Sequence, residues 1–130
     1  MSVDTIGNFL TVIRNGLMVG KRSVTIQHSN IKEEITKVLK EEGFVKDFKT
    51  TQKDNKTFLT VSLKYVSGEA VIHEITRIST PGRRHFERLN SITPVIGDLG
   101  ISILTTSRGV LSHRDAKRLS VGGEVICHVW

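Results

Sequence analysis

The sequence predicts an α+β fold made of two small lobes, and three observations support this class. The chain has 130 residues, the length of one ordinary domain or of two small lobes that share a core. Up to Val66, helical and strand periodicities alternate, whereas from Ser67 onward the pattern is mostly that of strands, with one short helix. We therefore expect an N-terminal helix/strand lobe over residues 1–66 and a C-terminal, mostly-strand lobe over residues 67–130.

Two amphipathic helices are expected in the N-terminal lobe, with a short strand over residues 24–26 between them. Asp4 can cap the first helix. The second begins at Asn30, with Glu33 at the spacing of a capping-box variant, and Gly43 stands where a helix-ending glycine usually does. The apolar residues at helical spacing are Ile6, Phe9, Leu10, Ile13 and Leu17 in the first helix and Ile31, Ile35, Val38 and Leu39 in the second.

A β-hairpin completes this lobe. Residues 44–50 and 57–65 have strand character and flank Asp54-Asn55, a pair of residues typical of tight hairpin turns. The return strand alternates apolar and polar side chains, which predicts one buried face. The dipeptide Ser67-Gly68 then marks the boundary between the lobes.

The C-terminal lobe is predicted to hold short strands and one basic helix. The strands cover residues 70–79, 101–104 and 124–130, with a further short strand through Phe86. Pro81-Gly82 suits the middle of a type II turn. Ser112 can cap the helix, which runs to Leu119.

Composition favours a soluble, intracellular protein with a polyanionic partner. Lys and Arg number 19 against 13 Asp and Glu, which favours nucleic acid or an anionic membrane as partner. No apolar run approaches the roughly 18 residues of a spanning helix, and the start of the chain lacks a signal-peptide profile, so no membrane is expected. The single cysteine, Cys127, fits a reducing compartment. Aromatic residues make up only 5%, which argues against a binder built on base stacking.

The kind of basic residue changes along the chain. Up to Tyr65, 9 of the 11 basic residues are Lys, whereas from Val66 onward 7 of the 8 are Arg. The guanidinium group matches phosphates and base edges with fixed geometry, while lysine acts as a point charge. Directed recognition is therefore expected in the C-terminal lobe.

The most informative stretch is the sequence Thr105-Thr106-Ser107-Arg108-Gly109, which we call the hydroxyl loop. Three consecutive hydroxyls at a strand end can meet 2′-hydroxyls and base edges in a shallow RNA minor groove. A glycine at the end of the loop would let backbone approach RNA closely. The alternative is an ordinary polar turn.

Two further basic groups are candidates for phosphate binding. Arg114 and Lys117 share a face of the predicted short helix. Arg77 and Arg84 flank the Pro81-Gly82 turn, and Ser79 projects with Arg77 if both lie in one strand. Solvated surface charge is the alternative for both groups.

Catalysis, metal binding and cofactor binding are not expected. The five histidines show no ligand spacing, and the lone cysteine lies in an apolar strand. Ser112 and His113 are adjacent, but a catalytic triad is assembled across a fold. A small hydrolase would need these side chains in a closed pocket with a distant carboxylate.

The order of these segments resembles one known family. Residues 99–110 (LGISILTTSRGV), residues 122–127 (GGEVIC) and the terminal Trp130 closely resemble the C-terminal signature of the eighth protein of the bacterial-type small ribosomal subunit. The similarity extends to residues 77–84 and to parts of residues 4–15, and so covers essentially the whole chain.

This resemblance implies two α+β lobes, no enzymatic activity, and direct binding to a helix of the central domain of small-subunit ribosomal RNA during early assembly. The residues it assigns to RNA binding are Thr105, Thr106, Ser107 and Gly109, together with Glu124 and, in the N-terminal lobe, the neighbourhood of Arg14 and Asn15. The partners it implies are small-subunit ribosomal RNA and neighbouring small-subunit ribosomal proteins. Several members of the family also repress translation of their own operon's messenger RNA, and a repressor that uses the same surface is the alternative function.

The resemblance leaves the compartment open. Thr5 stands where most bacterial relatives have proline, as in plastid versions. The expected location is therefore the ribosome, in the bacterial cytoplasm or the plastid stroma.

Overall fold

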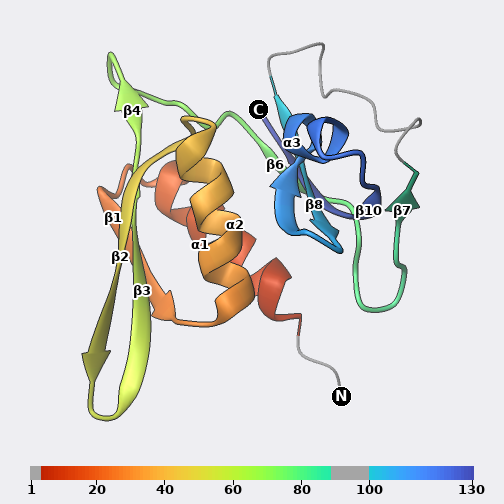
Figure 1. Ribbon diagram of the computed structural model, residues 1–130. Coiled ribbons are helices and arrows are strands. Elements are labelled where there is room, and N and C mark those ends of the chain that lie inside the picture. Colours follow the sequence, from red (N-terminus) through yellow and green to blue (C-terminus); the bar gives the residue numbers. More distant parts are fainter. Residues whose placement is uncertain (1–3, 89–99) are drawn as a thin grey trace.

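The computed structural model describes residues 4–88 and 100–130 (Figure 1). Leu99, the first residue of the C-terminal signature, lies outside the described residues. The elements of the N-terminal part are α1 (Thr5–Met18), β1 (Ser23–Gln27), α2 (Asn30–Glu41), β2 (Val45–Lys53) and β3 (Lys56–Leu63). The three strands form an antiparallel sheet of order β1-β3-β2, and both helices cover the same face of it (Figure 1). No helix within the described ranges is long and apolar enough to span a membrane.

The predicted cap of the first helix is confirmed, whereas that of the second is wrong by one residue. The Asp4 side chain accepts a hydrogen bond from the Gly7 amide at 3.0 Å. In α2 the cap is Ser29, which has an extended backbone and accepts from the Lys32 amide at 3.4 Å. Asn30 is already helical, so Glu33 does not close a capping box with it. The Glu33 carboxylate lies instead 3.1 Å from His28 Nε2 and 3.3 Å from Lys37 Nζ.

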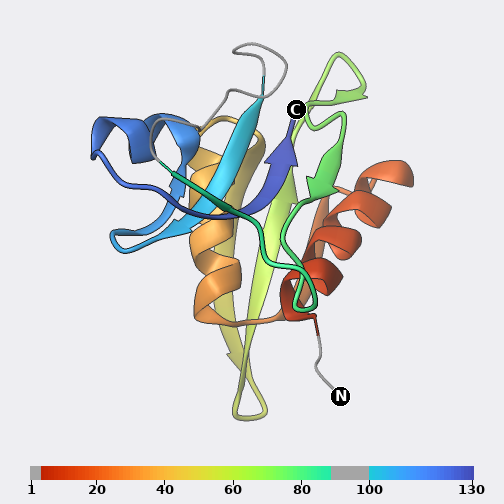
Figure 2. The same ribbon diagram turned by 90° about the vertical axis from the view of Figure 1, so that its right-hand side faces the viewer.

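The β2–β3 hairpin is confirmed, with strands that run closer to the turn than predicted. Asp54 and Asn55 both have positive φ, at 53° and 63°, as a two-residue type I′ turn requires. The strands pair up to Lys53 opposite Lys56, so the hairpin projects beyond the rest of the sheet (Figure 2). The alternation in β3 holds, because Leu59, Val61 and Leu63 are buried.

Ser67-Gly68 forms a tight turn between two short strands, β4 (Tyr65–Val66) and β5 (Glu69–Ala70). The strand predicted over residues 70–79 is wrong, because the chain leaves the sheet after Ala70 and returns only as β6 (Ile75–Arg77). The amides of His73 and Glu74 both donate to the carbonyl of Trp130, which turns this segment around the end of the last strand.

The Pro81-Gly82 turn exists, but the predicted turn type is wrong. Thr80 and Arg83 form an isolated bridge in which each amide donates to the other's carbonyl, at 3.0 and 3.1 Å. A type II turn needs positive φ at its third residue, and Gly82 does not have it.

The C-terminal part forms a five-stranded antiparallel sheet. Its elements are β6, β7 (Phe86–Glu87), β8 (Ile101–Thr106), β9 (Gly109–Ser112), α3 (His113–Arg118) and β10 (Gly123–Val129). The order is β6-β10-β8-β9, and β7 also pairs with β10. Strand β9 was not predicted, because it continues directly from the hydroxyl loop. The cap of α3 at Ser112 is confirmed.

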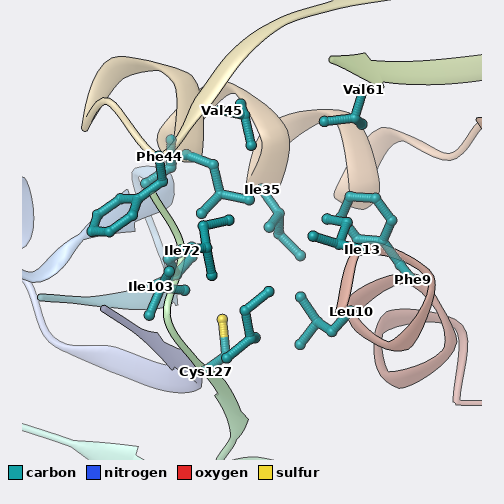
Figure 3. Packing of buried hydrophobic residues seen from close by; sticks show 14 of the residues in the cluster. Phe9, Leu10, Ile13, Ile35, Phe44, Val45, Val61, Ile72, Ile103 and Cys127 are labelled. Carbon is teal, nitrogen blue, oxygen red and sulfur yellow. The ribbon is translucent and has the colours of Figure 1, made fainter. Parts of the chain in front are cut away.

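One hydrophobic core lies between the two sheets. Helix α1 contributes Phe9 and Ile13, helix α2 contributes Ile35, and the five-stranded sheet contributes Ile103 and Cys127 (Figure 3). A smaller cluster of Leu104, Ala116 and Val125 lies under α3. Burial raises the pKa of the Cys127 thiol to about 12, since a thiolate would be desolvated there. The shared core holds the two sheets in a fixed arrangement, while the division into lobes at residue 66 stays a prediction.

Candidate nucleic-acid interface

The hydroxyl loop is the connection of the β8–β9 hairpin, and its three hydroxyls have different surroundings. Thr106 Oγ1 accepts from the Arg108 amide at 3.1 Å and donates to the Gly109 carbonyl at 2.8 Å, so this hydroxyl stabilises the turn itself. Gly109 has φ +108°, a conformation that other residues rarely adopt. Thr105 and Ser107 are exposed, and their hydroxyls bond to none of the described residues. Two of the three hydroxyls are therefore available to a ligand.

Glu124 lies beside this loop and is held in place by two donors. Strand pairing sets it directly opposite Thr105 on β8 and opposite Phe86 on β7, so all three side chains share one face of the sheet. The Ser79 hydroxyl donates to Glu124 Oε2, and Arg84 Nη1 lies 2.9 Å from the same oxygen. Ser79 is itself buried and accepts from the His85 amide at 3.1 Å.

The electrostatics of this cluster keep the Glu124 carboxyl ionised. Burial by itself raises the pKa of Glu124. The hydrogen bonds from Ser79 and Arg84, and the charges of Arg84 and Arg77, outweigh burial and bring the pKa below its ordinary value. At neutral pH, Glu124 thus presents a fixed acceptor next to the free Thr105 hydroxyl.

Gly123 makes this arrangement possible. A Cβ at this position would lie 2.2 Å from the backbone oxygen of Thr105, far inside van der Waals contact. Only glycine therefore allows β10 to approach β8 here, and this approach sets Glu124 opposite Thr105.

The structure does not place the basic helix on the same face as Glu124. Side chains alternate along β8 and β10, so Leu104 and Val125 pack under α3 while Thr105 and Glu124 point to the other face. Arg114 Nη1 lies 3.1 Å from Glu42 Oε2, at the end of α2, and so links α3 to the N-terminal part.

Lys117 is the more available of the two cations predicted on α3. Its side chain is exposed and makes no hydrogen bond or ion pair within residues 4–88 and 100–130. Arg108, at the tip of the hydroxyl loop, is exposed as well, and only its backbone amide has a partner there.

Arg77 is placed inside the molecule. Its side chain is only 15% exposed, its Nη1 lies 3.1 Å from Asp4 Oδ1, and its Nε donates to the Ser79 carbonyl. The residue thus joins the cap of α1 to the segment that positions Glu124.

Arg14 and Asn15 lie on α1 and are exposed. Arg14 Nη2 donates to the Ile75 carbonyl of β6. Figure 2 shows α1 and the β8–β9 hairpin on different sides of α2.

Phe86 is the residue of this cluster that the sequence reasoning missed. It is 69% exposed and directly opposite Glu124. The sequence did offer a signal for it: Phe86 is an aromatic residue in a predicted short strand, and Arg77, Arg83 and Arg84 precede it. We call Phe86, Thr105, Ser107 and Glu124 together the C-terminal surface.

Comparison with known proteins identifies the family. Residues 4–130 match the family model described as "Ribosomal protein S8". A protein of Thermodesulfovibrio yellowstonii named "Small ribosomal subunit protein uS8" is 44% identical over 131 aligned positions, which cover 100% of both chains. A protein of the same name from Acidobacterium capsulatum is 44% identical over 128 positions, which cover 98% of this chain and 97% of that one. The chain belongs to the ribosomal protein S8 family, whose members are structural ribosomal proteins and not enzymes.

Proposed function

We propose that this protein is a structural component of the small ribosomal subunit that binds a helix of the central domain of small-subunit ribosomal RNA through its C-terminal surface. The observation that carries the proposal is the row formed by Phe86, Glu124 and Thr105 beside Ser107. In this row an exposed aromatic ring, an ionised acceptor and two free hydroxyls lie next to each other.

This set of groups suits the minor groove of RNA. Ser107 and Thr105 are short enough to meet 2′-hydroxyls in a shallow groove, and each can donate and accept. The Glu124 carboxylate accepts only, so it selects a ribose hydroxyl or a base amino group and repels phosphate. The Phe86 ring offers a face for stacking on an unpaired base of an irregular helix.

Phosphate contacts would come from the cations around this surface. Arg108 and Lys117 are exposed, and neither side chain has a partner among the described residues. Arg114 can exchange Glu42 for a phosphate, and the side chain of Arg84, which pairs with Glu124, is 52% exposed. Such contacts set affinity and orientation, while the C-terminal surface supplies specificity.

Filter binding of the full chain to fragments of small-subunit ribosomal RNA tests this proposal. We expect one irregular helix of the central domain to bind far more tightly than a regular duplex of the same length at equal salt. Equal affinity for both RNAs would contradict the proposal.

Binding to the operon's own messenger RNA would use the same surface, because the contacts recognise the shape and sugar edge of a helix and not its source. Such a messenger would have to present a similar irregular helix. A competition assay measures this directly, since the messenger fragment should displace the ribosomal fragment from the wild-type chain and should fail to bind Glu124→Ala.

A further inference from the structure

We infer that Arg77 and Ser79 are positioning residues for RNA recognition, which hold the carboxylate of Glu124 in one orientation and do not bind RNA themselves. The inference rests on the proposed function of the C-terminal surface. The sequence suggested a direct contact with RNA for both residues. In the structure both side chains face inward instead, because Arg77 is 15% exposed and Ser79 only 1%.

The carboxylate of Glu124 depends on neighbouring side chains for its position. Strand pairing sets the backbone of Glu124 opposite Thr105 and Phe86, but it does not set the side chain. A glutamate side chain has several rotatable bonds, so an unsupported carboxylate would sample many orientations. A single orientation matters for recognition, because an acceptor that is already in place disfavours an RNA that offers it no donor.

Ser79 holds this carboxylate directly. Its hydroxyl accepts a hydrogen bond from the His85 amide at 3.1 Å, so the hydroxyl proton is free to point at Glu124 Oε2, to which it donates. The Ser79 amide donates to the carbonyl of Ile126 on β10, the strand that carries Glu124, at 3.4 Å. Both the backbone and the hydroxyl of Ser79 are thus fixed relative to Glu124.

Arg77 in turn holds Ser79. Its Nε donates to the Ser79 carbonyl, and its Nη1 lies 3.1 Å from Asp4 Oδ1 at the start of α1, which the segment after β6 passes (Figure 2). The planar guanidinium group makes these two bonds in fixed directions, and a lysine would carry the charge without this geometry. The charge of Arg77 also favours the ionised form of Glu124.

This arrangement separates Arg77 from the cations proposed to bind phosphate. The side chains of Arg108 and Lys117 are exposed and have no partner among the described residues, whereas Arg77 already uses Nε and Nη1 within the fold. To reach a phosphate, Arg77 would have to leave Asp4 and Ser79, and Glu124 would lose its support. Arg77 therefore affects which RNA is bound, and not the number of phosphates that the protein contacts.

The test measures how well Arg77→Lys and Ser79→Ala discriminate between two RNAs. Each full-length variant is titrated by filter binding at several salt concentrations with the irregular central-domain helix and with a regular duplex of the same length. Val24→Ala is the matched control, because it truncates a buried core residue of β1 and should lower stability without changing a contact of Glu124. Thermal melts show that each variant is folded at the temperature of the titration.

We expect Arg77→Lys and Ser79→Ala to bind the irregular helix several-fold more weakly than wild type, and the regular duplex like wild type. The log–log salt dependence should stay unchanged, because no phosphate contact is lost. Val24→Ala should keep the discrimination of wild type in spite of its lower melting temperature.

NMR titration of the Glu124 carboxyl carbon gives a readout that a merely structural role would not change. In Ser79→Ala the pKa of Glu124 should rise, because a hydrogen bond to the ionised form is lost. Arg77→Gln should raise the pKa as well, since it removes a positive charge near the carboxylate. In Val24→Ala the pKa of Glu124 should equal that of wild type.

A double variant tests whether Arg77 acts through Glu124. At low salt, where phosphate contacts alone support binding, adding Arg77→Lys to Glu124→Ala should change the affinity for neither RNA. A further loss on the irregular helix would show that Arg77 acts by another route and would overturn the inference.

Two other results would overturn it. Arg77 would be a phosphate ligand if Arg77→Lys and Arg77→Gln weakened binding of both RNAs equally and Arg77→Gln flattened the salt dependence by about one unit. Discrimination like that of wild type in both Arg77→Lys and Ser79→Ala would show that neither residue positions Glu124 for recognition. Equal affinity of the wild-type chain for both RNAs would instead contradict the proposed function.

Discussion

One oxygen of Asp4 accepts hydrogen bonds from both the Gly7 amide, at 3.0 Å, and the Arg77 guanidinium, at 3.1 Å. The first bond caps α1, and the second ties the helix to β6, far along the chain. Through its Nε, Arg77 also donates to the carbonyl of Ser79, whose hydroxyl holds Glu124. The start of the first helix is therefore linked to Glu124 of the C-terminal surface through Arg77 and Ser79.

This link predicts different effects for two substitutions of Asp4. Asp4→Ala removes both the cap and the ion pair and should lower the free energy of unfolding by about 1–2 kcal/mol. Asp4→Asn keeps a capping oxygen and loses only the charge, so its loss should be clearly smaller. Urea unfolding of both variants measures the difference, and equal losses would show that the ion pair matters more than the cap.

Gly123→Ala should be strongly destabilising. The new methyl group would collide with the Thr105 backbone, which cannot move as a flexible side chain can. We expect a loss of roughly 3 kcal/mol or more, at the severe end for single substitutions. Gly82→Ala is the control, because a Cβ there meets nothing within 4 Å and the backbone is not left-handed. A small effect of Gly123→Ala would mean that β8 and β10 can move apart with little loss of stability.

Two substitutions in the hydroxyl loop should have different effects, one on RNA binding and the other on stability. Ser107→Ala should leave the melting temperature unchanged and weaken binding of the irregular helix by about 1–3 kcal/mol, if the serine meets a buried partner on the RNA. Thr106→Val should lower the melting temperature, because its hydroxyl bonds within the turn. Thermal melts and filter binding of both variants test this. An unstable Ser107→Ala variant would make the loop a purely structural turn.

Glu124 should contribute an acid-sensitive part of the stability. Its pKa lies below the ordinary value of 4.5, so the unfolded chain takes up a proton at higher pH than the native chain does. The free energy of unfolding should therefore fall as the pH drops from about 4.5 through the lower native pKa. Glu124→Gln should show a smaller decrease when unfolding is measured across a pH series, while Glu33 and Asp47, whose pKa values are also lowered, keep their own contributions.

His128 provides an internal control for that series. Burial lowers its pKa below 6.5, so protonation of the unfolded chain should reduce stability as the pH drops below about 6.5. This decrease should be present in both the wild type and Glu124→Gln. If Glu124→Gln also lost the decrease below about pH 6.5, its fold would be disturbed. The comparison with wild type would then speak against a separate contribution of Glu124 to stability.

Glu42 and an RNA phosphate should compete for the guanidinium group of Arg114. Glu42→Gln removes a carboxylate that competes with phosphate for the guanidinium group, so it should tighten RNA binding modestly. The gain should vanish in the double variant that also carries Arg114→Ala. A double-mutant cycle measures this coupling, and a zero coupling energy would separate Arg114 from RNA binding.

Features that depend on neighbouring residues could be predicted from the sequence. The caps at Asp4 and Ser112 and the turn at Asp54-Asn55 follow from local hydrogen bonding and backbone preference. The cap of α2 could not be decided in this way, because Ser29 and Asn30 are adjacent and both are good caps.

Features that depend on distant partners could not be predicted. The strand expected over residues 70–79 breaks because His73 and Glu74 bond to the last residue of the chain. Likewise, Arg77 and Arg114 look like free cations in the sequence, and only the fold brings Asp4 and Glu42 to them. For the candidate site, the hydroxyl loop and Glu124 could be proposed from the sequence. That Phe86 lies opposite Glu124 could not, because this depends on the pairing of β7 with β10.

The single core between the two sheets has a consequence for amide hydrogen exchange. Phe9 and Ile35 pack in the same cluster as Ile103 and Cys127, so neither sheet can open without exposing the buried face of the other. The slowest amides of β3 and β10 should therefore exchange through one common opening reaction. An RNA helix bound only at Glu124 and Ser107 would slow exchange in β3 as much as in β10, because binding lowers the population of the open state for both strands.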